Sequence, residues 1–345
     1  MHRLSRNGIL GKRAMGTPRT IRFHGQEEPV LGEQVVQGRR YLVLERLNSR
    51  PGEALRVFDM QAGPGGDYRA LYVLPMSRAT QQQIGVLKRL GERGSSFPRL
   101  VDFARNRSSA TAVFTWVHGE NLRRFIDGAK RSEHPRPSPY EATRLVARLA
   151  HGLAPFHGKR LVVHGDIKPA NLVLARDPLR LVLVDFGSAW PVERTLRRER
   201  GDGATAPYAA PEQLLDTGLI DWRADIFALC VVWYELLTLA IPYDGLGGLA
   251  GLPGFRPQFA DKLVAPSECA SCAEQVPRAI WLRIDDTICR GLALDPNRRF
   301  SSSHEWLDAL NGIQNAMRTP DLLSSPNRRL LGWLEWLLPR RDKGS

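Results

Sequence analysis

The sequence predicts an α+β fold in two lobes, in which a strand-rich first third is followed by a helix-rich remainder. Short β-type runs, separated by turn-forming residues, occupy the chain from Tyr41 to Val117. After Gly119, apolar residues recur mostly at helical spacing. A chain of 345 residues, 43% of them hydrophobic, is long enough to bury a core in each lobe.

The domain boundaries follow from changes in composition and periodicity. The first residues are basic, contain glycine and show no periodicity, so we expect a flexible tail over 1–37. No apolar segment follows the basic residues at the N-terminus, which argues against a secretory signal. We expect an N-lobe over 38–118, a C-lobe over 119–316, and a separate C-terminal linker and helix over 317–345.

The N-lobe is predicted to contain strands and one helix. Clusters of Asn, Ser, Pro and Gly separate the first three strands, and the helix is expected where Ile84, Leu87 and Leu90 share helical spacing. The strands are predicted at 41–44, 54–58, 68–74, 100–103 and 111–117, and the helix at 80–90.

The C-lobe is predicted to be mainly helical. Its helices are expected at 122–127, 139–157, 221–239, 277–292 and 303–316, with a small β pair at 171–175 and 180–184. The most apolar stretch, 226–241, is about the minimum length of a membrane span. Because Glu235 interrupts this stretch, we expect a buried core helix.

The amino-acid composition favours certain classes of binding partner and a reducing compartment. Four cysteines in a chain of this length do not make a disulfide framework, which favours a reducing, cytoplasmic location. The net charge of +13 favours anionic partners such as nucleotide phosphates, acidic proteins or anionic lipid. No nucleic-acid-binding motif accompanies the charge, so no specific nucleic-acid partner is expected.

Two motifs carry the chemistry. His-Gly-Asp-Ile-Lys-Pro-Ala-Asn occupies 164–171, and Asp-Phe-Gly follows at 185–187 after a β-hairpin. In this order and spacing they resemble the catalytic loop (H-x-D-x-K-x-x-N) and the metal loop (D-F-G) of eukaryotic-type (Hanks-type) Ser/Thr protein kinases. The similarity continues through Ala-Pro-Tyr-Ala-Ala-Pro-Glu at 206–212 and covers about 38–316. It implies a bilobal protein-kinase-like fold.

The resemblance implies a role for each motif residue. Phosphoryl transfer depends mostly on positioning and charge neutralisation. Asp166 would accept or orient the proton of the substrate hydroxyl, and Lys168 would offset charge on the γ-phosphoryl group. Thr205 would bind near both residues, which favours a Ser/Thr acceptor. Asn171 and Asp185 would supply oxygen ligands to Mg²⁺ or Mn²⁺.

The resemblance also implies an ATP-binding set. Ala54 and Ala70 would cover one side of the adenine, and Val173 would cover the other. Phe114 would be the gatekeeper, and the backbone of Thr115 to Val117 would form the hinge that meets the base. All of them are equally suited to ordinary core packing.

Two features bear on the activation segment. Glu212 and Arg299 resemble the buried ion pair that anchors this segment in the family. Gly165 stands where many kinases have an arginine that receives an activation-loop phosphate, so activity is not expected to require that phosphate. The arginines within 194–200 form either an ordinary solvated face or a surface that recruits an acidic protein substrate.

The N-lobe departs from the family pattern at the positions that bind phosphate. Tyr72 occupies the position of the family's strand lysine, and Gln83 occupies the position of its glutamate partner. The glycine-rich loop, at 47–52, keeps one glycine. Two interpretations remain open. Arg50 or Arg56 supplies the missing cation, or the domain is a pseudokinase that binds nucleotide weakly or not at all.

Three function classes follow from these features. The leading prediction is an ATP- and Mg²⁺-dependent Ser/Thr protein kinase with a degenerate N-lobe. The alternative is a catalytically inactive pseudokinase scaffold. His-Gly-Asp in the catalytic loop suggests a small-molecule phosphotransferase, but the Ala-Pro-Glu segment and the helix that carries Asp225 argue against it.

The last segment is distinct in character. Residues 327–341 combine Trp and Leu with flanking Arg, and Lys343 follows, which predicts an amphipathic helix. The apolar part is much shorter than the ~20 residues that a membrane span needs. Two interpretations remain open, in which the helix either lies at a membrane surface or packs on its own domain or on a partner protein.

Overall fold

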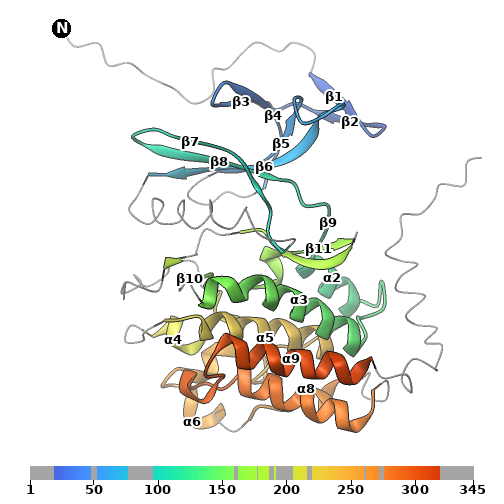
Figure 1. Ribbon diagram of the computed structural model, residues 1–345, viewed down its shortest axis with the longest axis vertical. Coiled ribbons are helices and arrows are strands. Elements are labelled where there is room, and N and C mark those ends of the chain that lie inside the picture. The colour runs from blue at the N-terminus through green and yellow to red at the C-terminus, as the bar shows by residue number, and fades with distance from the viewer. Residues whose placement is uncertain are drawn as a thin grey trace, which may run out of the picture. The chain divides into compact units, whose positions relative to one another are not determined.

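A computed structural model describes residues 19–47, 53–76, 96–158, 162–176, 178–185, 190–191, 205–215, 220–259, 262–271 and 276–318. The chain divides into two compact units. The N-terminal unit comprises 1–76 and 101–116, and the C-terminal unit comprises 77–100 and 117–345. The first unit is rich in strands and the second in helices, so the predicted α+β class is confirmed (Figure 1).

A six-stranded sheet with the order β3-β4-β5-β6-β8-β7 forms the N-terminal unit. The strands are β3 (Gly32–Val36), β4 (Arg39–Arg46), β5 (Glu53–Asp59), β6 (Asp67–Pro75), β7 (Leu100–Arg105) and β8 (Ser109–Thr115). The last five coincide with the strands predicted from short β-type runs separated by turn-forming residues. The helix predicted at 80–90 lies outside the described residues.

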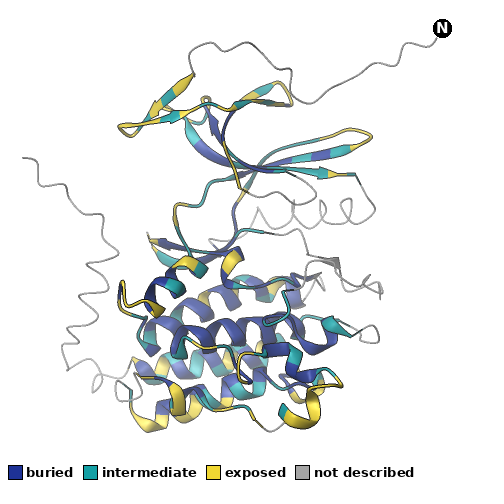
Figure 2. Cartoon of the chain, turned by 180° about the vertical axis from the view of Figure 1, so that it is seen from behind, coloured by how far each residue is buried: buried dark blue, intermediate teal, exposed yellow. Residues whose placement is uncertain are grey.

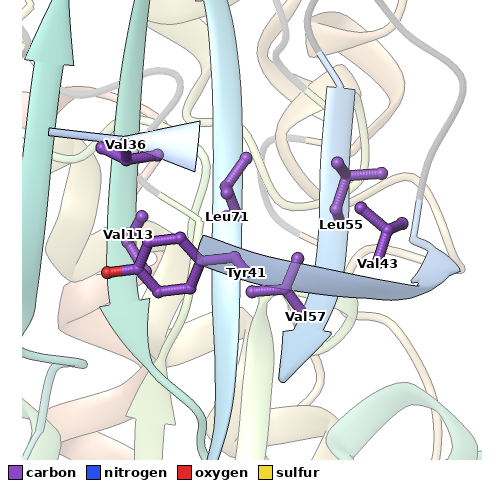
Figure 3. Close-up of a cluster of buried hydrophobic side chains, with 7 residues drawn as sticks. All are labelled: Val36, Tyr41, Val43, Leu55, Val57, Leu71 and Val113. Atoms are coloured by element: carbon purple, nitrogen blue, oxygen red, sulfur yellow. The ribbon is translucent and has the colours of Figure 1, made fainter. Parts of the chain in front are cut away.

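The two faces of this sheet carry different side chains, because neighbouring residues of a strand point to opposite sides. One face buries an apolar core formed by Val36, Tyr41, Val43, Leu55, Val57, Leu71 and Val113 (Figure 3). The Tyr41 hydroxyl donates to the Asp102 carboxylate at 3.1 Å, so the polar end of this buried ring has a partner. The opposite face carries Ala54, Ala70 and Tyr72.

The N-terminal region contains strands where we predicted a flexible tail. β1 (Thr20–Phe23) and β2 (Gln26–Pro29) form a hairpin, and β3 pairs with β4. Both hairpins turn through two residues with positive φ, and each turn ends in glycine, Gly25 at 78° and Gly38 at 83°. This is the geometry that two-residue β-hairpins favour. The tail prediction over 1–37 is therefore wrong for 20–36, whereas 1–18 lie outside the described residues.

Helices and small sheets build the C-terminal unit. The helices are α2 (Leu122–Lys130), α3 (Pro139–Gly158), α4 (Pro211–Leu214), α5 (Arg223–Thr238), α6 (Arg256–Phe259), α7 (Pro266–Cys269), α8 (Arg278–Gly291) and α9 (Ser303–Met317). The short 3-10 turns are η1 (Pro169–Asn171), η2 (Gly247–Gly251) and η4 (Pro296–Arg298). The strands are β9 (Gly119–Asn121), β10 (Val162–Val163), β11 (Leu172–Arg176), β12 (Leu179–Leu183) and β13 (Trp190–Pro191). The five predicted helices coincide with α2, α3, α5, α8 and α9.

Helix α5 is the centre of this unit. Every residue from 224 to 237 is buried, and α5 packs against α3 and α8 (Figure 2). A helix that is apolar on all sides is a core helix, as predicted for 226–241. Among the described residues, no helix is long and apolar enough to cross a membrane. The helix predicted within 327–341 lies outside those residues.

Candidate functional site

The C-terminal unit gathers the predicted catalytic residues around the carboxylate of Asp166. The ammonium group of Lys168 lies 3.0 and 2.8 Å from the two carboxylate oxygens, and it donates to Oγ1 of Thr205 at 2.6 Å. Thr205 Oγ1 is also 3.4 Å from Oδ1 of Asp166. Asp166 is thus held beside a cation and a hydroxyl group.

The local fold brings Asn171 back to the same carboxylate. Pro169 begins the turn η1, and the amide of Asn171 donates to the carbonyl of Lys168 at 3.0 Å. Nδ2 of Asn171 then donates to Oδ2 and to the backbone oxygen of Asp166, both at 2.9 Å. Because Nδ2 serves Asp166, the amide oxygen Oδ1 is the atom of Asn171 that faces elsewhere and suits a cation.

The β11–β12 hairpin brings the backbone just before Asp185 to Asn171. Leu172 pairs with Leu183, and the amide of Val184 donates to the carbonyl of Asn171 at 3.0 Å. The described residues contain no cluster of three His, Cys, Asp or Glu side chains suited to a metal ion. One carboxylate and one amide oxygen still fit Mg²⁺, which commonly takes its remaining ligands from phosphates and water.

A buried carboxylate, Asp225 on α5, fixes the start of the catalytic loop. It accepts hydrogen bonds from the amides of His164 and Gly165, both at 2.8 Å, and His157 Nε2 lies 3.0 Å away. Burial alone raises the pKa of Asp225, but His157, His164 and the Gly165 amide together outweigh it and hold this pKa below its usual value. Gln213 donates to the carbonyl of Gly165 at 2.8 Å and holds the loop from the other side.

The predicted ion pair between Glu212 and Arg299 is confirmed. Two parallel contacts join the groups, from Nη1 to Oε1 at 2.6 Å and from Nη2 to Oε2 at 2.9 Å. Both residues are buried. The pair ties α4 to the chain that follows η4, and it touches none of the predicted catalytic residues, so its role is structural.

A second buried network, which the sequence did not predict, is centred on Glu235. This carboxylate is fully buried on α5 and receives Arg123 Nη2 at 2.9 Å, Lys130 Nζ at 3.0 Å and the Tyr208 hydroxyl at 2.7 Å. Burial raises the pKa of Tyr208, which therefore stays a hydrogen-bond donor. A buried glutamate inside an apolar helix needs polar or charged partners. The presence of Glu235 in this helix is therefore the signal in the sequence that points to the network.

The N-terminal unit collects the predicted adenine-covering residues on one face of its sheet. Ala54 pairs with Tyr72 across β5 and β6, and Ala70 pairs with Phe114 across β6 and β8. The Tyr72 and Phe114 rings meet edge to face, with centroids 5.8 Å apart. An aromatic contact thus occupies the position where the family pattern has a lysine.

The predicted hinge residues fall on either side of the unit boundary. Thr115 ends β8, and Val117 begins the C-terminal unit. Val173 lies on β11, where it pairs with Val182 and Asn121.

Arg56, a candidate replacement for the lysine, is already paired with acidic residues. It lies directly opposite Ala70 on the same face of the sheet. Its guanidinium group makes a double contact with Glu28 and donates to Glu45 at 3.1 Å. Arg50 and Gln83 lie outside the described residues.

Comparison with known proteins decides the family. The model of the protein kinase domain matches residues 75–308, about two thirds of the chain. The chain belongs to the protein kinase domain family. The match begins at the last residue of β6, so the position of Tyr72 lies just outside it.

Curated relatives of this kinase domain include bacterial serine/threonine-protein kinases. The chain is 31% identical to pkn2 of Myxococcus xanthus over 233 residues, which cover 65% of the chain and 26% of that protein. It is 30% identical to PknJ of Mycobacterium tuberculosis over 249 residues, which cover 68% of the chain and 41% of that protein. The chain therefore spans less than half the length of these relatives.

A solved structure agrees with the fold. The PknI kinase domain of Mycobacterium tuberculosis, in a mutant form, superposes with a TM-score of 0.54 and 23% sequence identity. The match covers 81% of this chain and 97% of that one. The protein-kinase fold predicted from the motifs is confirmed.

Proposed function

We propose that this kinase domain catalyses ATP- and Mg²⁺-dependent phosphoryl transfer to Ser/Thr hydroxyl groups of protein substrates. The observation that carries the proposal is the cluster of Asp166, Lys168, Thr205 and Asn171 around one carboxylate. A carboxylate held beside a cation, with an amide oxygen that does not bind this carboxylate, provides the groups that phosphoryl transfer needs.

Each residue of the cluster has one role in this proposal. Asp166 accepts the proton of the attacking hydroxyl, and Lys168 offsets negative charge on the transferred group. Thr205 is hydrogen-bonded to Lys168. It helps to hold its own segment of the chain in a form that accepts Ser or Thr residues of the substrate. Oδ1 of Asn171 and the carboxylate of Asp185 hold Mg²⁺ or Mn²⁺, which neutralises phosphate charge.

The same proposal assigns contacts with the adenine base to five residues. Ala54 and Ala70 present small apolar side chains to the adenine ring, and Val173 contributes a third apolar contact. The backbone at Thr115 and Val117 meets the edge of the base. Small and branched apolar residues suit a flat ring because they leave room for it without polar groups that would need partners.

Transfer of label from γ-labelled ATP to the chain itself and to a generic acceptor tests the proposal. Full-length protein is assayed with Mg²⁺ or Mn²⁺ beside Asp185→Ala, which removes a metal ligand, and beside Asp308→Ala. Asp308 is an exposed carboxylate on α9, so its variant controls for loss of charge. We expect label with wild type and Asp308→Ala and none with Asp185→Ala. No label with any of the three would contradict kinase activity.

Tyr72 supports the second candidate, a pseudokinase scaffold. The Tyr72 ring is packed against Phe114, and the nearest paired arginine on that face, Arg56, is held by two carboxylates. Without a cation on the phosphates, transition-state stabilisation falls by about 3–4 kcal/mol, by analogy with other deleted electrostatic contacts. The scaffold predicts no label transfer with either metal, whereas slow transfer that depends on Asp185 supports the enzyme.

A further inference from the structure

The β1–β2 hairpin packs on the same face of the N-terminal sheet that carries Ala54 and Ala70. The Phe23 ring lies 4.9 Å from the ring of Phe58 and 5.1 Å from that of Tyr68, both edge to face. Phe58 is two residues beyond Arg56 on β5, and Tyr68 is two residues before Ala70 on β6, so both share that face. The hairpin therefore borders the residues proposed to meet adenine.

Glu28 joins the hairpin to Arg56. Its carboxylate contacts two guanidinium nitrogens of Arg56 and accepts a hydrogen bond from the Tyr68 hydroxyl. Burial and this hydrogen bond raise the pKa of Tyr68 to about 12, so the phenol remains a donor. With Glu45 also in contact, two carboxylates neutralise one guanidinium group.

The paired arginine is directed away from Tyr72. Its guanidinium carbon lies 5.2 Å from the centre of the Tyr68 ring and 6.0 Å from that of Trp116. Tyr72 lies on the other side, two residues beyond Ala70 on β6, a step of about 7 Å along a strand. An arginine side chain is long enough to cover such a step once it is released.

We propose that the β1–β2 hairpin is a latch on the nucleotide-facing side of this sheet. Glu28, as a positioning residue, keeps Arg56 near Tyr68 and Trp116. Release of Arg56 gives the nucleotide phosphates the cation that Tyr72 does not provide. The inference rests on the proposed nucleotide binding, but not on catalysis. Because phosphates and Glu28 compete for one guanidinium group, latch closure and triphosphate binding weaken each other.

Equilibrium binding of ATP and of adenosine to the full chain tests the latch. Glu28→Gln keeps the size of the side chain and an acceptor for Tyr68 while it removes the charge that holds Arg56. We expect ATP to bind at least about 5-fold more tightly, the lower end of typical coupling between sites, and adenosine to bind with unchanged affinity. Adding Arg56→Met to Glu28→Gln should abolish the gain.

Glu33→Gln is the matched control. Glu33 also pairs with an arginine on an adjacent strand, Arg40, but this pair is largely exposed and lies away from Ala70. Unchanged ATP affinity in Glu28→Gln, no ATP binding by any variant, or an equal gain for adenosine would each overturn the latch. Tighter ATP binding without label transfer would leave the latch standing and refute the kinase activity.

Hydrogen exchange provides a second measurement. Competition for Arg56 predicts that saturating ATP accelerates amide exchange in residues 20–29 of the wild-type chain, whereas adenosine does not. Equal protection of these amides with both ligands would contradict the latch, even if Glu28→Gln changed stability.

Discussion

Glu212, Asp225 and Glu235 are carboxylates removed from water, and each has several charged or amide partners in the C-terminal unit. Burial of an ionised group is costly unless its partners replace the lost hydration. Glu212 has two nitrogens of Arg299, whereas Glu235 has Arg123, Lys130 and Tyr208. These contacts hold side chains of the C-terminal unit in place. Because they mainly replace lost hydration, they do not each add to the free energy of unfolding.

The Glu212–Arg299 pair leads to a prediction at the residue scale. Glu212→Gln leaves the guanidinium group of Arg299 buried without its charged partner, and loss of one member of such a pair costs about 3–5 kcal/mol. We expect the free energy of unfolding to fall by that amount in urea denaturation.

The matched control is Glu305→Gln. Glu305 pairs with Arg290 at 2.5 Å, but both side chains are more than a third exposed. Water screens such a pair, so its loss should cost less than about 1 kcal/mol. Equal effects of the two substitutions would show that burial of the Glu212 pair has no bearing on stability.

At the scale of elements, the turn η2 lies directly against the chain that leads into α4. The amide of Gly248 donates to the carbonyl of Pro207 at 3.3 Å. A Cβ atom on Gly248 would lie 1.7 Å from the carbonyl oxygen of Ala209, and one on Gly247 would lie 1.8 Å from that of Pro207. Only glycine allows this backbone approach, so η2 supports the segment that carries Thr205 and Tyr208.

Gly248→Ala should therefore disturb residues 205–211. Because the obstructing atom is backbone oxygen, either this segment or η2 has to move, and overpacking of this kind costs about 1–3 kcal/mol or more. We expect a lower melting temperature and a loss of label transfer of at least tenfold. Gly254→Ala, with no atom within 4 Å of the new methyl group, is the control. Wild-type transfer by Gly248→Ala would contradict this role of η2.

Predictability from sequence differed between elements for physical reasons. The sequence predicts strands β4 to β8 because short runs of β-branched, aromatic and other apolar residues lie between turn-forming residues. The basic, glycine-containing composition of 1–37 as a whole predicts a tail and masks the β1–β2 hairpin. The dipeptides His24-Gly25 and Gln37-Gly38 were the overlooked signal, since both residues of each turn need positive φ.

The residues of the candidate site also differ in how well the sequence predicts them. Asp166, Lys168 and Asn171 were predicted because one short loop sets their spacing, and the structure brings them together. Partners that are distant in sequence carry no such spacing. Glu28 is 28 residues from Arg56, and Arg123 is 112 residues from Glu235. Only folding reveals which charges meet across such separations.

At the scale of the whole molecule, the net charge and the C-terminal segment bear on where in the cell the protein lies. The chain carries a net charge of +13, and residues 327–341 add Trp, Leu and flanking basic residues outside the described part of the structure. A cytoplasmic location, with 327–341 either at a membrane surface or packed on the protein or on a partner, stays a prediction, and the membrane alternative has a physical basis. Trp and Leu bury apolar area at the headgroup boundary, and Lys and Arg attract anionic lipid.

Co-sedimentation with liposomes tests this prediction. Full-length protein and a chain ending at Pro320 are compared on vesicles of phosphatidylcholine with and without phosphatidylserine. We expect the full chain to pellet with anionic vesicles and to be released by salt, because each basic residue near such a surface contributes about 1 kcal/mol and salt screens that attraction. The shortened chain, which retains the kinase domain and the basic N-terminus, should stay in the supernatant. Equal pelleting of both chains would assign the contact to the basic surface elsewhere, and no pelleting of either would favour a protein partner for 327–341.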